Sequence, residues 1–427
     1  LYDSLRVINE RYLSAGDLFY VQKAAAVMRD MITNGRMPDD LQQQIIESYH
    51  TLSKLYNTES VDVAIRSSAT AEDLPNASFA GQQESYLNIR FDDELIISVQ
   101  KCMASLFTER AIIYRIENNF EHEKVAISVG VQKMIRSDLA SSGVSFSIDP
   151  ETGHPDIICI ESSYGLGETI VQGKVTPDAF MVHKPTLKKG YKSLIKKQCG
   201  DKKNKMIYDK HAHVHMVSVD ASDQIKFSLS DDEVIHIAQL TLTIEEYYSQ
   251  KKGHAIPVDV EWAKDGNDQK IYIIQARPET VHANKKEVEK LVYRIAHNVL
   301  HPISILHGIS VGNQIVTGTA RLINSAKQLS LVESGDIIIT DMTDPDWVPI
   351  MKRAAAIITN RGGRTCHAAI VSRELGIPAL VGTLRVTSSI RKGQEITLDC
   401  SQGVTGFVYD GHIPYEIQLK RFPPIFL

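Results

Sequence analysis

The stretch TNRGGRTCHAAIVSRELGIPALVG, residues 359–382, holds the clearest local signals in this 427-residue chain. Two glycines permit a sharp turn of the backbone, and Thr365 or Cys366 can begin a helix with a buried alanine, valine and leucine face. A glycine and then a proline end that helix. The pattern therefore predicts a short helix with His367 in its first turn, followed by a buried strand.

The predicted position of His367 suits chemistry with anions. The first turn of a helix offers N–H groups and the positive end of the helix dipole. Imidazole, with an unperturbed pKa of about 6.5, keeps a large neutral and nucleophilic fraction near pH 7. Arg364 adds a cation that can neutralise phosphoryl oxygens. The residues alone leave two interpretations open: a phosphoryl-carrying histidine, or a helix-capping histidine packed on a neighbouring strand.

Strand-like segments lie on both sides of this helix. They are QIVTGTARLI (314–323), GDIIITD (335–341), AAAIITN (354–360), PALVG (378–382) and EITLDC (395–400). With the helix they predict a compact α/β domain over residues 308–410. Residues 283–307 are predicted to be a linker, helical over 283–300, and residues 411–427 a tail or a connection onward.

Residues 1–282 mix helical and strand patterns and form the larger part. Residues 1–57 predict two or three amphipathic helices, and VDVAIRSS from Val61 alternates like a strand. DDELIISVQKCMASLFTERAIIYRI, residues 92–116, predicts one long helix, and strands continue to about residue 280. The chain as a whole is therefore expected to be a multidomain α+β and α/β protein.

Composition excludes several classes of protein. An apolar fraction of 43% with a net charge of −5 argues against disorder, coiled coil and a nucleic-acid partner. Apolar runs stay short of the roughly 18 residues that a membrane helix needs. The five cysteines are widely spaced and are expected to be reduced thiols. We expect a cytoplasmic protein with small-molecule partners and no membrane.

A lysine-rich segment and a histidine-rich segment both favour ordinary surface structure. KKGYKSLIKKQCGDKKNK, residues 188–205, is rich in lysine, but it lacks the interleaved aromatic residues of a nucleic-acid site and favours a solvated hairpin. HAHVHM, residues 211–216, has alternate histidines that could share a strand face, but no fixed carboxylate or cysteine accompanies them. An exposed hairpin is the preferred interpretation there as well.

Two further segments carry residues suited to a nucleotide. In VAIRSSATAEDLPNASFAGQQESYLNI (63–89), a strand delivers Arg66 to a small-residue loop whose N–H groups can approach phosphate. VDVEWAKDGNDQKIYIIQARPET (258–280) predicts a hairpin in which Glu261 and Gln275 could hold Mg²⁺.

The two ligands must share one face of that hairpin. A two-residue loop would pair Glu261 with Tyr272 and separate Gln275 from it, whereas a five-residue loop would pair Asp259 with Gln275. We predict the five-residue loop, which places Glu261 and Gln275 on one face.

The histidine segment, with TDPDWVPIMKRAAAIITN (343–360) before it, resembles the phosphohistidine domain of the phosphoenolpyruvate synthase (pyruvate, water dikinase) family of PEP-utilising enzymes. In that family the matching histidine is the phosphocarrier, which implies this role for His367. Pyruvate, phosphate dikinases usually have GGMTSHAA at this point, so Thr365–Cys366 favours the synthase. The resemblance implies a swivelling β/β/α domain.

Residues 1–282 resemble the ATP-grasp domain of the same family. The resemblance implies these contacts to ATP: Arg66 and Arg277 at the phosphates, Gly81 and Ser85 in a lid, Gln132 and Met134 beside adenine, and Glu261 and Gln275 at Mg²⁺. Glu168, in GLGETIVQG, also lies in matching sequence, and its role stays open.

The family's reaction gives the expected function. ATP phosphorylates the histidine, the γ-phosphoryl is lost to water, AMP leaves, and the β-derived phosphoryl passes to pyruvate to form phosphoenolpyruvate. The family's glycine-rich N-terminal segment, with its ATP-contacting lysine, and its C-terminal pyruvate-binding barrel lack counterparts here. We therefore expect an incomplete chain, whose parent would bind pyruvate, and dimerise, through the barrel. A rifampin phosphotransferase-like or pyruvate, phosphate dikinase activity, or a silent nucleotide-binding module, are the alternatives.

Overall fold

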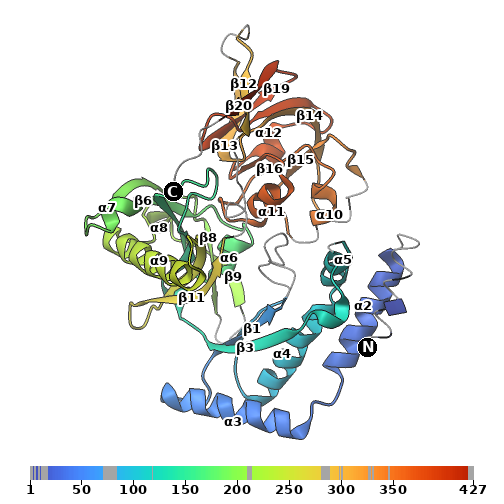
Figure 1. Ribbon diagram of the computed structural model, residues 1–427, viewed down its shortest axis with the longest axis vertical. Coiled ribbons are helices and arrows are strands. Elements are labelled where there is room, and N and C mark those ends of the chain that lie inside the picture. Colours follow the sequence, from blue (N-terminus) through green and yellow to red (C-terminus); the bar gives the residue numbers. More distant parts are fainter. Residues whose placement is uncertain are drawn as a thin grey trace. The chain divides into compact units, whose positions relative to one another are not determined.

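The computed structural model shows several sheets and helices that group into two compact units (Figure 1). Residues 18–70, 84–117, 119–208, 214–279, 289–297, 302–325, 331–344 and 347–421 are described, together with 3, 6–7, 10, 299 and 328. The smaller unit contains residues 1–135 and 208–215, and the larger contains 136–207 and 216–427. The expected multidomain mixture of α and β structure is confirmed.

The smaller unit packs helices on a three-stranded antiparallel sheet of order β2-β1-β3. Its elements are α2 (Leu18–Thr33), α3 (Asp39–Leu55), β1 (Val63–Ala69), β2 (Tyr86–Ile89), α4 (Asp92–Ala104), η1 (Ser105–Phe107), α5 (Glu109–Glu117), η2 (His122–Lys124) and β3 (Ile127–Lys133). Apolar residues of α3 and α4 pack against the sheet, and α2 packs against α5.

The single long helix predicted for residues 92–116 is wrong, because the chain breaks into α4, η1 and α5. Thr108 is extended, with ψ 152°, and its side-chain Oγ1 accepts a hydrogen bond of 3.3 Å from Ala111 N. Ser105 Oγ donates at 2.7 Å to Cys102 O. Such short polar side chains bond to nearby backbone and favour helix ends over helix interiors.

The larger unit begins with a six-stranded antiparallel sheet of order β11-β10-β4-β5-β6-β7. Its strands are β4 (Ser141–Phe146), β5 (Ile157–Tyr164), β6 (Asp178–His183), β7 (Leu194–Gln198), β10 (Val258–Lys264) and β11 (Ile271–Pro278). Short helices η3 (Ser137–Leu139), α6 (Glu168–Val171), α7 (Lys184–Leu187) and α8 (Ala221–Gln224) lie in its connections.

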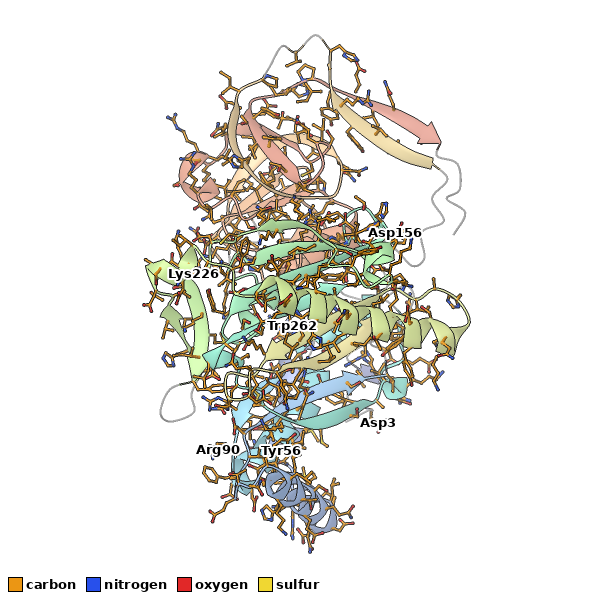
Figure 2. The ribbon with its side chains drawn as sticks, turned by 90° about the vertical axis from the view of Figure 1, so that its left-hand side faces the viewer. Asp3, Tyr56, Arg90, Asp156, Lys226 and Trp262 are labelled. Atoms are coloured by element: carbon orange, nitrogen blue, oxygen red, sulfur yellow. The ribbon has the colours of Figure 1, made fainter. Side chains whose placement is uncertain are left out.

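One face of this sheet is covered by helix α9 (Asp231–Lys252). A capping box between Ser230 and Glu233 begins the helix, and apolar residues of α9 pack on Ile158, Phe180 and Trp262. Figure 2 labels Trp262 in this layer, and its side chain is 1% exposed. Alternate residues of these strands point away from α9, toward the opposite face of the sheet.

The lysine-rich segment 188–205 is not the predicted solvated hairpin. Strand β7 forms the edge of the six-stranded sheet, whereas β8 (Asn204–Tyr208) pairs with β9 (Val214–Ser218). Between β7 and β8, Lys202 is fully buried, and its Nζ lies 2.5 Å from Asp178 Oδ1. The histidine-rich segment is described only from residue 214, where β9 begins, and residues 211–213 lie outside the described residues.

The larger unit continues into a closed barrel of order β13-β17-β16-β15-β14-β18-β19. Its strands are β13 (Ser304–Val311), β14 (Ile315–Leu322), β15 (Ile337–Thr340), β16 (Ala356–Thr359), β17 (Ala379–Val381), β18 (Glu395–Asp399) and β19 (Thr405–Asp410). Strands β14, β15, β16 and β17 are parallel neighbours in that order. The five predicted strand segments are confirmed, and β13 and β19 complete the barrel.

Among the described residues of this segment, the barrel is accompanied by the helices α10 (Val348–Met351), α11 (His367–Leu375) and α12 (Val386–Ser389). Ile337, Ile339 and Leu398 are among the residues that fill one apolar cluster. Ile338 and Ile357 point the other way and form a second cluster with Ala368 and Val371 of α11. The strands that carry α11 are therefore buried on both faces, as their continuous apolar sequences indicate.

The helix predicted within the linker is wrong, since residues 289–295 form a strand. This strand, β12 (Glu289–Ile295), pairs with β20 (Tyr415–Arg421), which lies in the predicted tail. The register runs from Glu289 opposite Arg421 to Ile295 opposite Tyr415. Isolated from its partner, the lysine- and glutamate-rich start of this segment favours a helix, but pairing with a distant strand decides the outcome.

All five cysteines are thiols rather than disulfides, as predicted. Among the described residues, we find no helix with the length and apolar character needed to cross a membrane.

Candidate functional site

The loop between β16 and α11 presents His367 as the sequence predicts. Gly362 has φ 111°, and a Cβ at this position would lie 2.7 Å from Cys366 Sγ, so the turn requires glycine. Cys366 is the extended N-cap residue, and His367 is the first residue of α11. Gly376 ends the helix in the left-handed conformation, with φ 70°.

The imidazole of His367 is oriented by Thr343. The two groups form a hydrogen bond of 2.9 Å between Thr343 Oγ1 and His367 Nδ1, and Thr343 is only 3% exposed. Thr343 follows β15 just as the His367 loop follows β16, so both lie at the carboxyl ends of parallel strands. When Nδ1 carries the proton and donates to Oγ1, the lone pair of the ring is on Nε2.

Sequence reasoning missed Thr343. A buried strand followed by a polar loop is the usual place for site residues at a sheet edge, and this signal could have identified it.

The residues before His367 contact the six-stranded sheet. Arg364 is 8% exposed, and its Nη1 lies 3.4 Å from Asp149 Oδ1. Its backbone N–H donates at 2.8 Å to Glu161 Oε1, and Thr365 Oγ1 donates to the other Glu161 oxygen. The predicted role of Arg364 in stabilising a phosphoryl group stays a prediction, since the structure shows its guanidinium against a carboxylate.

The β10–β11 hairpin has a register that differs from the prediction. Asp259 pairs with Arg277 rather than with Gln275, and Lys264 pairs with Ile271, which leaves a loop longer than five residues. A β-bulge between Glu261 and Trp262 corrects the register, so that Glu261 lies opposite Gln275. Residues directly opposite in an antiparallel pair share a face. The same-face condition for a metal pair is therefore met by a route that the sequence analysis did not predict.

The bulge has a clear physical cause. Ile273 packs with Trp262 in the cluster under α9, and in a regular strand Gln275, two residues later, would face the same way. The extra residue, Ile274, lets Ile273 lie in the core and Gln275 on the opposite face.

An ion pair flanks this position. Arg277 Nε lies 2.8 Å from Asp259 Oδ2 and 3.0 Å from Oδ1. Both side chains are two residues from the Glu261–Gln275 pair and so share its face. The sequence analysis placed Asp259 opposite Gln275, whereas the structure places it opposite Arg277, and the ion pair between Asp259 and Arg277 was not predicted.

The other predicted nucleotide-binding residues lie in the smaller unit. Arg66 on β1 pairs with Gly130, and Ala64 pairs with Gln132 on β3, so Arg66 and Gln132 share one face of that sheet. Ser85 is exposed just before β2, and Met134 is buried, with its N–H donating at 2.8 Å to Asp62 O. Gly81 lies outside the described residues.

Comparison with known protein families gives the class of this chain. Residues 3–295 match the pyruvate phosphate dikinase AMP/ATP-binding domain, and residues 332–403 match the mobile domain of PEP-utilising enzymes. The chain belongs to the pyruvate phosphate dikinase family, with its nucleotide-binding and mobile domains in the expected order.

Curated relatives extend the similarity over most of the chain. Phosphoenolpyruvate synthase of Aquifex aeolicus is 51% identical over 421 residues, which cover 98% of this chain and 49% of the relative. The phosphoenolpyruvate synthase of Helicobacter pylori is 47% identical over 398 residues, covering 92% and 49% respectively. The chain thus spans about half the length of the curated relatives it matches.

Proposed function

We propose that this chain is the nucleotide-binding and phosphocarrier part of a pyruvate, water dikinase. The observation that carries the proposal is the hydrogen bond between Thr343 Oγ1 and His367 Nδ1, at the first position of α11. When Nδ1 carries the proton and donates to this hydroxyl, the lone pair that can attack phosphorus is on Nε2. The matches to both family domains support the same assignment.

The proposed chemistry follows from that nitrogen. Nε2 of His367 attacks the β-phosphorus of ATP, the bond from this phosphorus to the α–β bridging oxygen breaks, and AMP leaves. Water then removes the γ-phosphoryl group as phosphate, and the phosphoryl left on Nε2 passes to pyruvate. N–H groups of the first turn of α11 and the Arg364 guanidinium would stabilise the carried group.

The proposed nucleotide site combines charge and hard oxygen ligands. Glu261 and Gln275 lie opposite each other, where Cβ atoms are about 5 Å apart, so one carboxylate and one amide oxygen can reach one Mg²⁺ ion. Within the described residues, no group of three or more His, Cys, Asp or Glu residues could hold a metal ion. Mg²⁺ would take its other ligands from phosphates and water and would screen their charge.

The remaining assignments complete the proposal. Arg66 and Arg277 would neutralise phosphate charge, Gly81 and Ser85 would cover the phosphates, and Gln132 and Met134 would border adenine. Residues 1–282 would form the nucleotide domain, 283–307 a connection, 308–410 the carrier domain and 411–427 a connection onward. Pyruvate and phosphoenolpyruvate would bind a further domain, through which the protein would dimerise in the cytoplasm.

The test uses ATP labelled separately at the β and γ phosphates, with Mg²⁺ and the whole chain. We expect acid-labile label from the β position on the protein, with release of AMP and phosphate. His367→Ala should abolish it, whereas His307→Ala, an exposed position on the same barrel, should leave it unchanged. Retention of γ label alone would contradict the dikinase pathway, and nucleotide binding without any label would favour a silent module.

A further inference from the structure

We propose that Glu161 is a positioning residue, which fixes the His367 loop (residues 360–366) on the sheet face that carries Glu261 and Gln275. The inference rests on the proposed function, because it assigns the carboxylate a role in bringing His367 to the nucleotide. Glu161 lies on β5 and is 4% exposed.

Both carboxylate oxygens of Glu161 accept hydrogen bonds from the His367 loop. Oε1 accepts the backbone N–H of Arg364 at 2.8 Å, and Oε2 accepts the hydroxyl of Thr365. A Cβ added at Gly363 would lie 3.1 Å from Oε1 and 2.8 Å from Pro177 Cδ, so the loop backbone fits closely against the sheet. These contacts end two residues before His367, which makes the carboxylate an anchor for the start of α11.

The sheet register relates this anchor to the proposed metal pair. Gln275 lies opposite Glu261, Glu261 opposite Val144, and Val144 opposite Glu161. The four residues form one row across β11, β10, β4 and β5, and members of such a row share a face. Two strand spacings separate Glu161 from Glu261, which is about 10 Å.

Two other acidic residues make a different kind of contact with the barrel. Glu151 binds the Arg373 guanidinium and accepts the N–H of Gly312 at 3.1 Å, and Asp149 lies beside the Arg364 side chain. Glu151 thus contacts α11 and the turn after β13, which lie outside the His367 loop, and Asp149 contacts the loop through the side chain of Arg364. Glu161 instead binds the loop backbone and a hydroxyl next to His367, so it determines where the loop lies.

Energy also favours a functional role. Burial raises the pKa of Glu161, although the hydrogen bonds from Thr365 and Arg364 oppose this effect. A buried carboxylate is a weak source of stability, since an apolar side chain of similar size often packs at no loss. A positioning role explains why a carboxylate rather than an apolar side chain is found at position 161, because a displacement of about 1 Å can slow a reaction by about a hundredfold.

The test compares Glu161→Ala, Glu161→Gln and the matched interface variant Glu151→Gln in the whole chain. Three quantities are measured: the single-turnover rate of β-label transfer to His367, the Kd for ATP, and hydrogen exchange at the Arg364 amide. We expect Glu161→Ala to slow transfer by about 30-fold or more with Kd unchanged within about twofold, and to speed Arg364 exchange. Glu161→Gln keeps one hydrogen-bond acceptor, and we expect it to lower the rate of β-label transfer by about three- to tenfold.

Glu151→Gln should change the transfer rate by no more than about threefold and leave Arg364 exchange as in the unchanged chain. Equal effects of Glu151→Gln and Glu161→Gln, or unchanged exchange in Glu161→Ala, would overturn the proposal. If the unchanged chain takes no β label, the proposed function fails by itself, and the exchange measurement still decides the anchor. If Glu161→Ala does not fold, Thr365→Val removes one of the two bonds, and an unchanged transfer rate would overturn the proposal.

Discussion

Replacing Thr343 by valine tests how the reactive nitrogen of His367 is selected. The substitution keeps the size of the side chain and removes the hydroxyl that lies 2.9 Å from Nδ1. A hydrogen bond of this kind contributes about 0.5–1.5 kcal/mol, and a buried donor left without a partner costs about 1–3 kcal/mol. Thr343 is 3% exposed, so water cannot readily replace the hydroxyl, and the larger range applies.

A cost of about 1–3 kcal/mol corresponds to a rate about 5- to 160-fold lower, at 1.36 kcal/mol for each factor of ten. The penalty falls on the state in which Nδ1 carries the proton and Nε2 attacks. Rapid-quench measurement of β-label transfer from ATP under single-turnover conditions gives this rate directly. The Kd for ATP should not change, because Thr343 belongs to the barrel and not to the proposed nucleotide site.

Thr343→Ser is the matched control, since it keeps the hydroxyl and loses only a methyl group. We expect it to stay within about threefold of the unchanged chain. A wild-type rate in Thr343→Val would refute the role of the hydroxyl. A serine variant as slow as the valine variant would show that packing of the methyl group, rather than the hydrogen bond, is what matters.

Three further predictions concern the metal pair and two buried groups. Glu261→Ala should raise the Mg²⁺ concentration for half-maximal β-labelling by about tenfold or more, whereas Asp268→Ala at the hairpin tip should not; equal effects would contradict the metal assignment. Lys202→Met should lower the free energy of unfolding by about 3–5 kcal/mol in urea titrations, because it leaves the fully buried Asp178 carboxylate without its ammonium partner; a loss below about 1 kcal/mol would contradict this. Burial, and then the charge of Arg115, lowers the pKa of His122 to about 4, so the unfolded chain binds more protons between pH 4 and about 6.5. Stability of the smaller unit should therefore fall as the pH drops through this window, by at most about 1.4 kcal/mol per pH unit, and a dependence that persists in His122→Gln would have another source.

The helix that presents His367 could be predicted because its signals are local. Glycines before it, an apolar face within it, and Gly376 and Pro378 after it lie within one short stretch, and each indicates the same boundaries. The five strand segments around it were predictable for the same reason, as each is a short apolar run buried on both faces. The chemical assignment of His367 depended more on the resemblance to known proteins than on these patterns.

Features that depend on distant partners were not predictable in this way. Strand β12 exists because β20 pairs with it, and the two segments lie on opposite sides of the barrel sequence. The bulge at Glu261 depends on the core packing of Ile273, so counting loop residues gave the wrong register. Glu161 contacts a loop that lies far along the chain, and an isolated glutamate in a strand gives no sign of such a contact.

Because β12 pairs with β20, the whole barrel is an insertion between two adjacent strands. The chain enters and leaves the barrel along two adjacent strands, and Ile295 lies directly opposite Tyr415 where they meet it. A tight turn joining these two residues would close the stem as an ordinary hairpin and excise the barrel without separating the remaining ends. The same stem offers a point for joining the barrel that holds His367 to another protein, because donor and host would need to match only one two-stranded joint.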